Sequence, residues 1–175
     1  MSDFKTFESE RLILKPTSED DAQFILDLLN TPKWLKYIGD RDVKTLADAK
    51  AYIEKRITAQ FNKLGYGNYT VTRKSDEKKI GSCGLYDREG LEGIDIGFAF
   101  LPQYERMGYA YESALKIKEI AINEFNINEI VAITLKENIS SQKLLIKIGL
   151  AFEKMISIPN DDEELMLFRF TTIAK

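Results

Sequence analysis

One stretch decides the fold: residues 102–114, with the sequence PQYERMGYAYESA. It follows an apolar run that ends at Leu101, and it leads into a segment whose apolar residues recur at helical spacing to about Phe125. A glycine and a small residue at the start of a helix let the backbone approach an anion, which the free N–H groups and the helix dipole favour. Arg106 can add a charge-assisted contact. The stretch therefore predicts an anion site at a helix N-terminus; the alternative is a plain turn with a solvated Arg106.

The segments before this stretch indicate one strand, two helices and three further strands. A polar cap precedes each helix, at residues 18–21 and 45–48. Between the helices, residues 34–39, WLKYIG, are expected to form a loop rich in aromatic side chains. The expected elements are a strand over 9–16, a helix from the first cap to about Leu29, a helix over 45–62, and a meander of strands over 67–73, 79–86 and 93–101.

The segments after the long helix complete the pattern. Residues 129–135 are nearly all apolar, as expected of a strand that is covered on both faces. A short helix over 141–148 follows, then two strands at about 152–158 and 164–170. The element order is β-α-α-β-β-β-α-β-α-β-β. It predicts an α/β (α+β) fold over residues 1–175, a single domain with a central mixed, mostly antiparallel sheet of about seven strands and about four helices.

The composition narrows the chemistry that the chain can perform. Among 175 residues there are 28 acidic and 25 basic side chains, and the formal net charge of −3 argues against a nucleic-acid partner. The absence of histidine excludes Ser-His and Cys-His nucleophile systems and histidine-ligated zinc, so we expect no metal. Cys83 is the only cysteine, and without a histidine to activate it we expect a buried small residue rather than a nucleophile. Proton transfer then depends on Asp, Glu, Tyr, Ser, Lys or water.

The sequence also bears on where the protein acts. Residues 1–15 are polar and charged, without the apolar core of a signal peptide. No run approaches the roughly 20 apolar residues of a membrane span. We therefore expect a cytoplasmic protein with no membrane partner.

Four segments together resemble one known family. Residues 102–114 resemble the cofactor motif of the GNAT superfamily of acyl-CoA N-acyltransferases, in which this loop holds the pyrophosphate of coenzyme A. Residues 138–150, NISSQKLLIKIGL, are similar to the N-x-x-S helix of that family and the glycine after it. Residues 9–14, SERLIL, and 95–98, DIGF, resemble the branch that includes the ribosomal-protein N-terminal acetyltransferases. The resemblance extends from about Ser9 to Phe170, nearly the whole chain.

This resemblance implies a GNAT-like domain that acts as an acetyl-CoA-dependent N-acetyltransferase. The acceptor would be a primary amine, either a protein N-terminal α-amine or a small-molecule amine, that attacks directly in a ternary complex. A covalent acyl-enzyme is unnecessary because a thiolate, with a thiol pKa of about 8.5, is a fair leaving group. Two alternatives remain open: a non-catalytic acyl-CoA-binding sensor or interaction domain, and a structural domain without affinity for coenzyme A. A homodimer is compatible with the sequence.

The cofactor contacts are taken from the same resemblance. The backbone of residues 98–100 is expected to contact the pantetheine arm, because the family splays this strand away from the next one. Asn138 would bond the pantetheine amides or fix its own loop as an Asx-turn. Two positions depart from the family: Glu105 replaces a usual Gln or Arg, and Leu145 replaces a frequent Tyr that acts as the general acid. The implied cofactor-binding residues are Phe98, Ala99, Phe100, Arg106, Met107, Gly108, Tyr109, Ala110, Tyr111, Asn138 and Ser141.

Three residues are candidates for proton transfer. Asp95 is the candidate base, at a position where the family often has Glu; the alternative is an exposed carboxylate on the polar face of a strand. Ser141 is the first candidate for the proton donor and Tyr86 the second. Ser141 could instead cap the helix that starts there.

Aromatic residues are the candidates for the acceptor pocket, because an aromatic cluster can receive an amine or a peptide end. They could equally belong to the core or to a dimer contact. These substrate-binding candidates are Trp34, Tyr37, Tyr66 and Tyr69.

Overall fold

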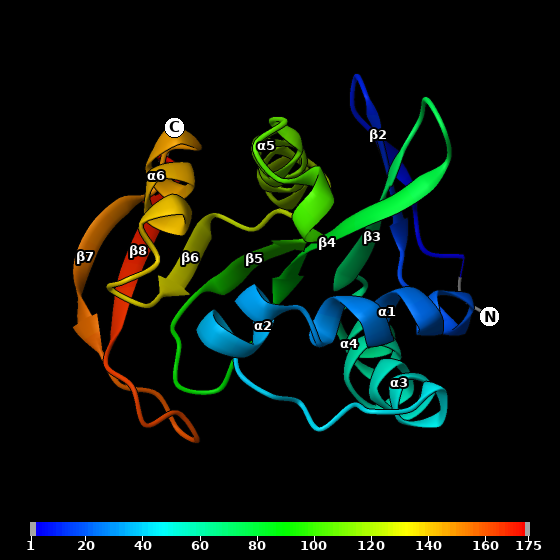
Figure 1. The fold of residues 1–175 in the computed structure, drawn as a ribbon. Helices are drawn as coiled ribbons and strands as arrows, with labels where there is room; N and C mark the ends of the chain where they lie inside the picture. The colour runs from blue at the N-terminus through cyan, green and yellow to red at the C-terminus, as the bar shows by residue number, and fades with distance from the viewer. Residues whose placement is uncertain (1–2, 174–175) are drawn as a thin grey trace.

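A computed structural model describes residues 3–173, and within this range the chain forms one mixed sheet of eight strands (Figure 1). The strand order is β1-β2-β3-β4-β5-β6-β8-β7. Every neighbouring pair is antiparallel except β5 and β6, which are parallel. The strands are β1 (Phe7–Glu8), β2 (Leu12–Pro16), β3 (Asn68–Arg73), β4 (Lys78–Tyr86), β5 (Ile94–Phe100), β6 (Glu129–Thr134), β7 (Ala151–Ile156) and β8 (Leu165–Thr171). The predicted fold class is confirmed, and the strand beyond the expected seven is the two-residue β1.

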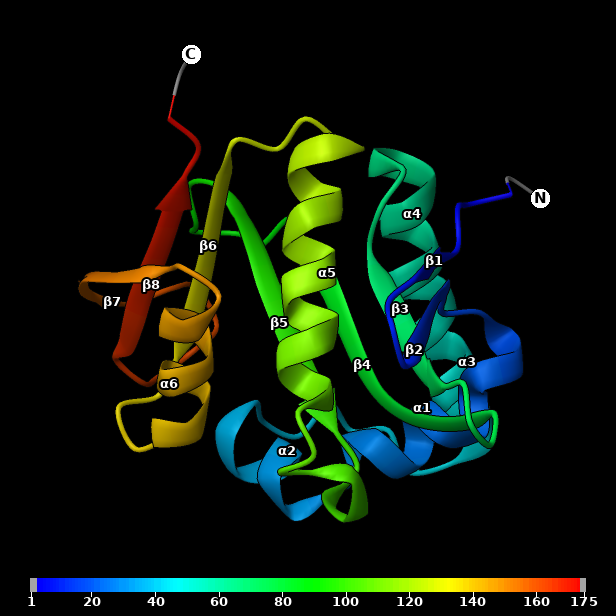
Figure 2. The ribbon, with the colours of Figure 1, turned by 90° about the horizontal axis from the view of Figure 1, so that it is seen from above.

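Helices cover both faces of the sheet. Helices α5 and α6 lie on one face and α1 to α4 on the other, as the two views agree (Figures 1 and 2). Short 3₁₀ turns precede α1, at Glu19–Asp21, and follow β5, at Pro102–Tyr104. The helices are α1 (Ala22–Leu29), α2 (Pro32–Tyr37), α3 (Leu46–Tyr52), α4 (Ala59–Leu64), α5 (Tyr109–Asn123) and α6 (Ile139–Lys147).

The expected loop over residues 34–39 is wrong, because most of this segment is helix α2. Thr31 has the extended backbone of an N-cap residue, and Pro32 stands at the first helical position. Proline fits there because its fixed φ suits a helix and its missing N–H would have had no partner. This two-residue start signal outweighs the aromatic composition that suggested a loop.

The predicted second helix is confirmed, with one irregular turn inside it. At its start the N–H of Asp48 donates to the Thr45 hydroxyl at 3.1 Å, and the N–H of Thr45 donates to the Asp48 carboxylate at 2.9 Å. A π-helical segment, Ile53–Thr58, then joins α3 to α4. Such segments are rare and frequently occur at functional sites.

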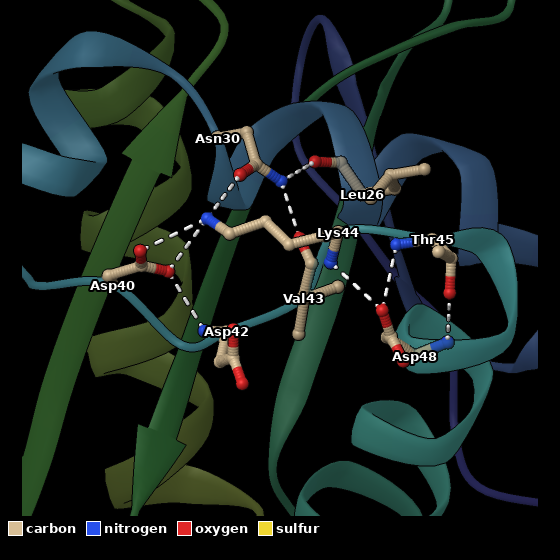
Figure 3. A network of polar contacts seen from close by, with 8 residues as sticks. All are labelled: Leu26, Asn30, Asp40, Asp42, Val43, Lys44, Thr45 and Asp48. Atoms are coloured by element: carbon tan, nitrogen blue, oxygen red, sulfur yellow. Dashed lines mark hydrogen bonds and ion pairs between the residues drawn. The ribbon is translucent and has the colours of Figure 1, made fainter.

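A network of polar contacts fixes the connection between α2 and α3 (Figure 3). Asn30, at the end of α1, donates to the backbone carbonyls of Leu26 and Val43 at 2.8 Å each. The ammonium of Lys44 donates to the side-chain oxygen of Asn30 at 3.2 Å and to the carboxylate of Asp40 at 3.0 Å. This connection therefore has a defined position, which matters because it forms one wall of the cavity described below.

Strand alternation assigns the side chains of β4 to opposite faces of the sheet. Cys83 is fully buried and lies beside Ser113 of α5, so Cys83 faces α5. Ser82 and Tyr86 therefore face α1 to α4, because successive side chains of a strand alternate. Burial raises the pKa of the Cys83 thiol to about 12. The expectation of a buried cysteine is confirmed, and its raised pKa disfavours the thiolate that a nucleophile needs.

Within residues 3–173, no helix is both long and apolar enough to cross a membrane.

Candidate active site

A V-shaped opening between β5 and β6 forms the centre of the site. The two strands pair only at their first residues, Ile94 with Ile130 and Asp95 with Val131, and then diverge. Within residues 3–173, β5 forms no further pairs with β6 beyond Asp95, although its N–H and C=O groups need partners. The opening belongs to a cavity of about 1660 Å³ that residues 96–100 and 132–135 help to line.

The N-terminus of α5 lies at this cavity. Its N-cap, Gly108, has a φ of 81°, and Arg106 has a φ of 60°, so the chain turns through two left-handed residues before the helix. For arginine this conformation is strained, and such strain is typical of functional loops. The first helical hydrogen bond runs from the N–H of Glu112 to the carbonyl of Gly108 at 3.0 Å. The N–H groups of residues 109–111 therefore remain for a ligand.

The N-terminus of α6 lies at the same cavity. Its N-cap is Asn138, whose side-chain oxygen accepts from the N–H of Ser141 at 3.3 Å. The alternative in which Ser141 caps this helix is therefore wrong, and the helix begins two residues earlier than expected. Ser141 lines the cavity, as do the cations Arg106, Lys143 and Lys147. The cavity has other charged lining residues of both signs, but the two helix N-termini with Arg106, Lys143 and Lys147 make this part of it suited to an anionic ligand.

Arg11 contacts the turn before α5 and the first turn of this helix. Its guanidinium donates to the carbonyl oxygen of Met107 at 3.0 Å and to the carboxylate of Glu112 at 2.7 Å. It also lies over the ring of Tyr109, 4.5 Å from the ring centre. The Ser9 hydroxyl donates to the same carboxylate at 2.7 Å. Burial opposes ionisation of Glu112, but the hydrogen bonds from Arg11 and Ser9 outweigh it and lower its pKa.

Asp95 lies at the vertex of the V and is nearly inaccessible, with 3% of its surface exposed. The alternative of an exposed strand carboxylate is therefore wrong. Arg88, in the β4–β5 connection, donates from Nε to its carboxylate at 2.9 Å. Burial raises the pKa of Asp95 to about 6, and the charge and hydrogen bond of Arg88 limit the rise. A carboxyl with this pKa can accept a proton near neutral pH and return it.

The matching family is that of the acetyltransferase (GNAT) domain, whose model matches residues 11–151. The chain belongs to the GNAT acetyltransferase family. Over 157 residues it is 30% identical to the uncharacterized N-acetyltransferase YnaD of Bacillus subtilis, which covers 89% of each chain. It is accordingly an acyltransferase.

Solved GNAT structures have the same fold. The acetyltransferase (GNAT family) from Bacillus anthracis superimposes with a TM-score of 0.78 at 22% identity, over 95% of this chain and 98% of that one. RimL, a ribosomal L7/L12 α-N-protein acetyltransferase in complex with coenzyme A, gives a TM-score of 0.77 at 14% identity, over 95% and 98%. At these identities the likeness concerns the fold alone.

The structure brings nearly all predicted cofactor residues of this GNAT domain to the one cavity. Met107 is the exception: its side chain is 48% exposed and does not line the cavity. Its carbonyl instead accepts from Arg11. The predicted cofactor and proton-transfer residues that line the cavity are Phe98, Ala99, Phe100, Arg106, Gly108, Tyr109, Ala110, Tyr111, Asn138 and Ser141, together with Asp95 and Tyr86.

The two departures from the GNAT pattern have structural explanations. Glu105 forms an ion pair with Lys33 of α2 at 2.6 Å, which offsets its charge beside the turn that begins α5. Leu145 is buried and lines the cavity, so an apolar side chain occupies the position where many members have their tyrosine acid. Within residues 3–173, no group of three or more His, Cys, Asp or Glu could hold a metal ion.

The four aromatic candidates separate into two pairs. Trp34 and Tyr37, on α2, line the cavity, and the buried indole N–H of Trp34 has no hydrogen-bond partner among the described residues. Tyr66 and Tyr69 do not line it. Tyr69 is 1% exposed and packs against aromatic rings of the core, and Tyr66 packs against Phe125. Tyr69 is therefore a core residue, and the partly buried Tyr66 packs against the core, as the alternative interpretation had it.

Sequence reasoning missed several residues at the site. Arg88 lies in an irregular loop, where no periodicity indicates which side chain it meets. Arg11 stood in a quoted motif, but only the fold brings it to residues about a hundred positions away. Asn68, at the start of β3, lines the cavity with Tyr86, and a polar residue at a strand start gives no signal of this role.

Proposed function

We propose that this chain binds acetyl-CoA in the V between β5 and β6 and transfers the acetyl group to a primary amine. The observation that carries the proposal is the divergence of β5 from β6 directly beside the N-terminus of α5. Unpaired strand backbone suits the amides of the pantetheine arm, and the free N–H groups of residues 109–111 with Arg106 suit the pyrophosphate. Membership of the GNAT family supports acetyl-CoA as the donor.

Two side chains carry the proposed proton transfers. The thioester supplies the acetyl group and a thiolate leaving group. Asp95 takes a proton from the amine, for which its raised pKa and its place at the vertex of the V are suited. Ser141 donates a proton to the departing sulfur from the first turn of α6. The amine attacks directly in a ternary complex, because the buried Cys83 and the lack of histidine leave no activated nucleophile.

For the acceptor we propose a protein N-terminal α-amine, with small primary amines as the second candidates. The segments SERLIL and DIGF, which resemble the ribosomal-protein branch, support the first choice. An α-amine has a pKa of about 7.7–8.0, so part of it is already neutral at physiological pH. Trp34 and Tyr37 supply an aromatic wall that suits a peptide end.

Thermal unfolding with and without acetyl-CoA tests the proposal first. At about 100 times Kd, a ligand adds roughly 2.7 kcal/mol to the free energy of unfolding. For a chain of this size each kcal/mol raises Tm by about 2–4 °C. We expect Tm to rise by several degrees with acetyl-CoA and not with ATP or NAD. An unchanged Tm at saturating acetyl-CoA would refute the proposal.

Thiol release with a panel of acceptors then identifies the amine. The panel contains alanine- and serine-initiated tetrapeptides, the same peptides with acetylated N-termini, and small primary amines such as 2-phenylethylamine. We expect thiol release with free N-termini and none with blocked ones. Release with the small amines alone would favour the second acceptor class.

Replacing Glu105 by glutamine should strengthen binding of coenzyme A. The change removes a negative charge beside the proposed pyrophosphate site and frees Lys33, the present partner of that charge. Because both side chains are partly exposed, we expect a modest effect, about a two- to fivefold lower Kd. Isothermal titration with coenzyme A measures it. The control is the same substitution at Glu119, near the C-terminal end of α5. Glu119→Gln should leave Kd unchanged. A higher Kd for Glu105→Gln would contradict the proposed position of the pyrophosphate.

A further inference from the structure

A chain of buried polar side chains runs from the cavity into the sheet. The hydroxyl of Tyr86 and that of Ser82, the latter at 2.6 Å, both donate to the side-chain oxygen of Asn68. The amide nitrogen of Asn68 donates to the Thr17 hydroxyl at 2.8 Å, which in turn bonds the Thr70 hydroxyl at 2.8 Å. Asn68, Ser82 and Tyr86 line the cavity, whereas Thr17 and Thr70 lie behind it. Asn68 is thus the junction between Tyr86 and the interior.

Two glycines leave the space that the Tyr86 side chain occupies. A Cβ on Gly97 would lie 2.9 Å from the Tyr86 ring, and a Cβ on Gly84 would lie 2.9 Å from its hydroxyl and 2.5 Å from the carbonyl oxygen of Gly67. The sequence therefore leaves room for this ring at two positions on neighbouring strands. A tyrosine that is held by two glycines and an asparagine has one defined orientation.

That orientation determines what the hydroxyl can do. A carbonyl oxygen only accepts hydrogen bonds, so the Tyr86 proton is directed to Asn68. The Ser82 hydroxyl also lies near Tyr86, but its single proton is directed to Asn68, so the lone pairs of the Tyr86 oxygen remain available. Burial also raises the pKa of Tyr86, which keeps the proton on it. Tyr86 is the direct cross-strand partner of Asp95, so both side chains project from the same face of the sheet.

We infer that Asn68 is a positioning residue that fixes Tyr86 as a hydrogen-bond acceptor for the substrate amine. The inference rests on the proposed function and gives Tyr86 a role other than the proton donor first suggested for it. A neutral primary amine has two N–H groups. One donates to Asp95, which takes its proton, and the other donates to the Tyr86 oxygen. A secondary amine has a single N–H and leaves one of the two acceptors unpaired, which costs binding in a buried site. The arrangement therefore selects primary amines.

The test compares one primary amine with its N-methyl derivative. The probes are the most active free amine of the acceptor panel and the same compound methylated on nitrogen. The quantity measured is the ratio of kcat/KM for the primary amine to kcat/KM for its N-methyl derivative. We expect Tyr86→Phe to lower this ratio by about five- to tenfold, because the variant has no oxygen to accept a hydrogen bond from the second N–H of the amine. Asn68→Leu should lower it similarly, and the double variant should lower it no further than Tyr86→Phe alone.

Two more variants separate this role from a structural one. Asn68→Asp keeps the acceptor oxygen and should keep the ratio within about twofold of the unmodified protein, as expected if Asn68 acts only by accepting. Thr70→Val removes the far end of the same network and is the matched control: Tm should fall while the ratio stays unchanged. Tyr86→Phe retains the ring and its packing, so it remains informative if Asn68→Leu does not fold.

The outcomes are distinguishable from failure of the proposed function. If no amine releases thiol, the proposed function fails. If amines are acetylated but Tyr86→Phe leaves the ratio unchanged, the role of Tyr86 is refuted. If the effects of Asn68→Leu and Tyr86→Phe add in the double variant, Asn68 acts independently of Tyr86 and the inference is wrong. Loss of the ratio in Asn68→Asp would likewise overturn it, because this variant retains an oxygen that can accept from Tyr86.

Discussion

Replacing Asp95 by asparagine is expected to lower kcat by about 10²- to 10⁴-fold, the usual contribution of a positioned general base. The amide keeps the size of the side chain but cannot take a proton from the amine. Thiol release at saturating acetyl-CoA and amine measures the change. The matched control is Asp87→Asn, in a carboxylate that borders the same cavity but is half exposed and pairs with Lys63. We expect kcat of the control to change by less than about threefold.

The pH dependence of kcat provides an independent check. Asp95 must be ionised to accept a proton, so kcat should rise with pH through a midpoint near 6, the raised pKa of this carboxyl. Arg88 favours the ionised form, so removing its charge raises the pKa of Asp95 further. Arg88→Gln should therefore move the midpoint to higher pH. A midpoint that moves to lower pH, or kcat of Asp95→Asn close to that of the unmodified protein, would exclude Asp95 as the base.

Thermal unfolding of Asp95→Asn at several pH values tests whether its lost activity reflects unfolding. The pKa of Asp95 is higher in the folded protein than its ordinary value of 3.8, so the folded state binds this proton more tightly. The contribution of Asp95 to the free energy of unfolding therefore falls as pH rises from about 4 to 6, and it is smallest above that range. Asparagine does not titrate. The Tm of Asp95→Asn relative to the unmodified protein should accordingly increase with pH across this window.

Most of the elements, and the turn that begins α5, could be predicted from the sequence. The turn at 102–114 depends on local features, a glycine and a helix start, and both are found where expected. The same holds for the cap at Thr45. Helix α2 was missed because its start signal is only Thr31-Pro32, which is weaker than a repeating pattern.

The burial of individual side chains and their long-range partners could not be predicted from the sequence. The alternation around Asp95 is equally compatible with a polar face in solvent, and only the central position of β5, covered by helices on both faces, buries it. Tyr69 shows the reverse case, because its alternating strand could have presented it to a pocket, but its face packs against Phe61. The partner of Glu105 lies 72 residues away, and pairs at such separation leave no local pattern.

Replacing Arg11 by alanine is expected to raise the Kd for coenzyme A by about 10- to 30-fold, or about 1.4–2 kcal/mol. Arg11 joins the carbonyl of Met107 to the carboxylate of Glu112 across the turn that begins α5. Without it, the negative charge of Glu112 stands unpaired in the first turn of a helix that is proposed to bind pyrophosphate. Isothermal titration with coenzyme A measures the loss, and kcat at saturation should change little.

A second substitution tests whether the effect is electrostatic. If the unpaired negative charge of Glu112 is the main cause, Arg11→Ala combined with Glu112→Gln should bring the Kd back to within about threefold of the unmodified protein. If Arg11 acts chiefly as a mechanical brace, the double variant should bind as weakly as Arg11→Ala. We expect recovery, because Glu112 is largely buried and its charge is therefore poorly screened. Arg169 of β8, which pairs with Glu129 of β6 and Glu153 of β7, provides the control: Arg169→Ala should leave the Kd unchanged. An unchanged Kd in Arg11→Ala would show that the turn holds its shape and its affinity without this arginine.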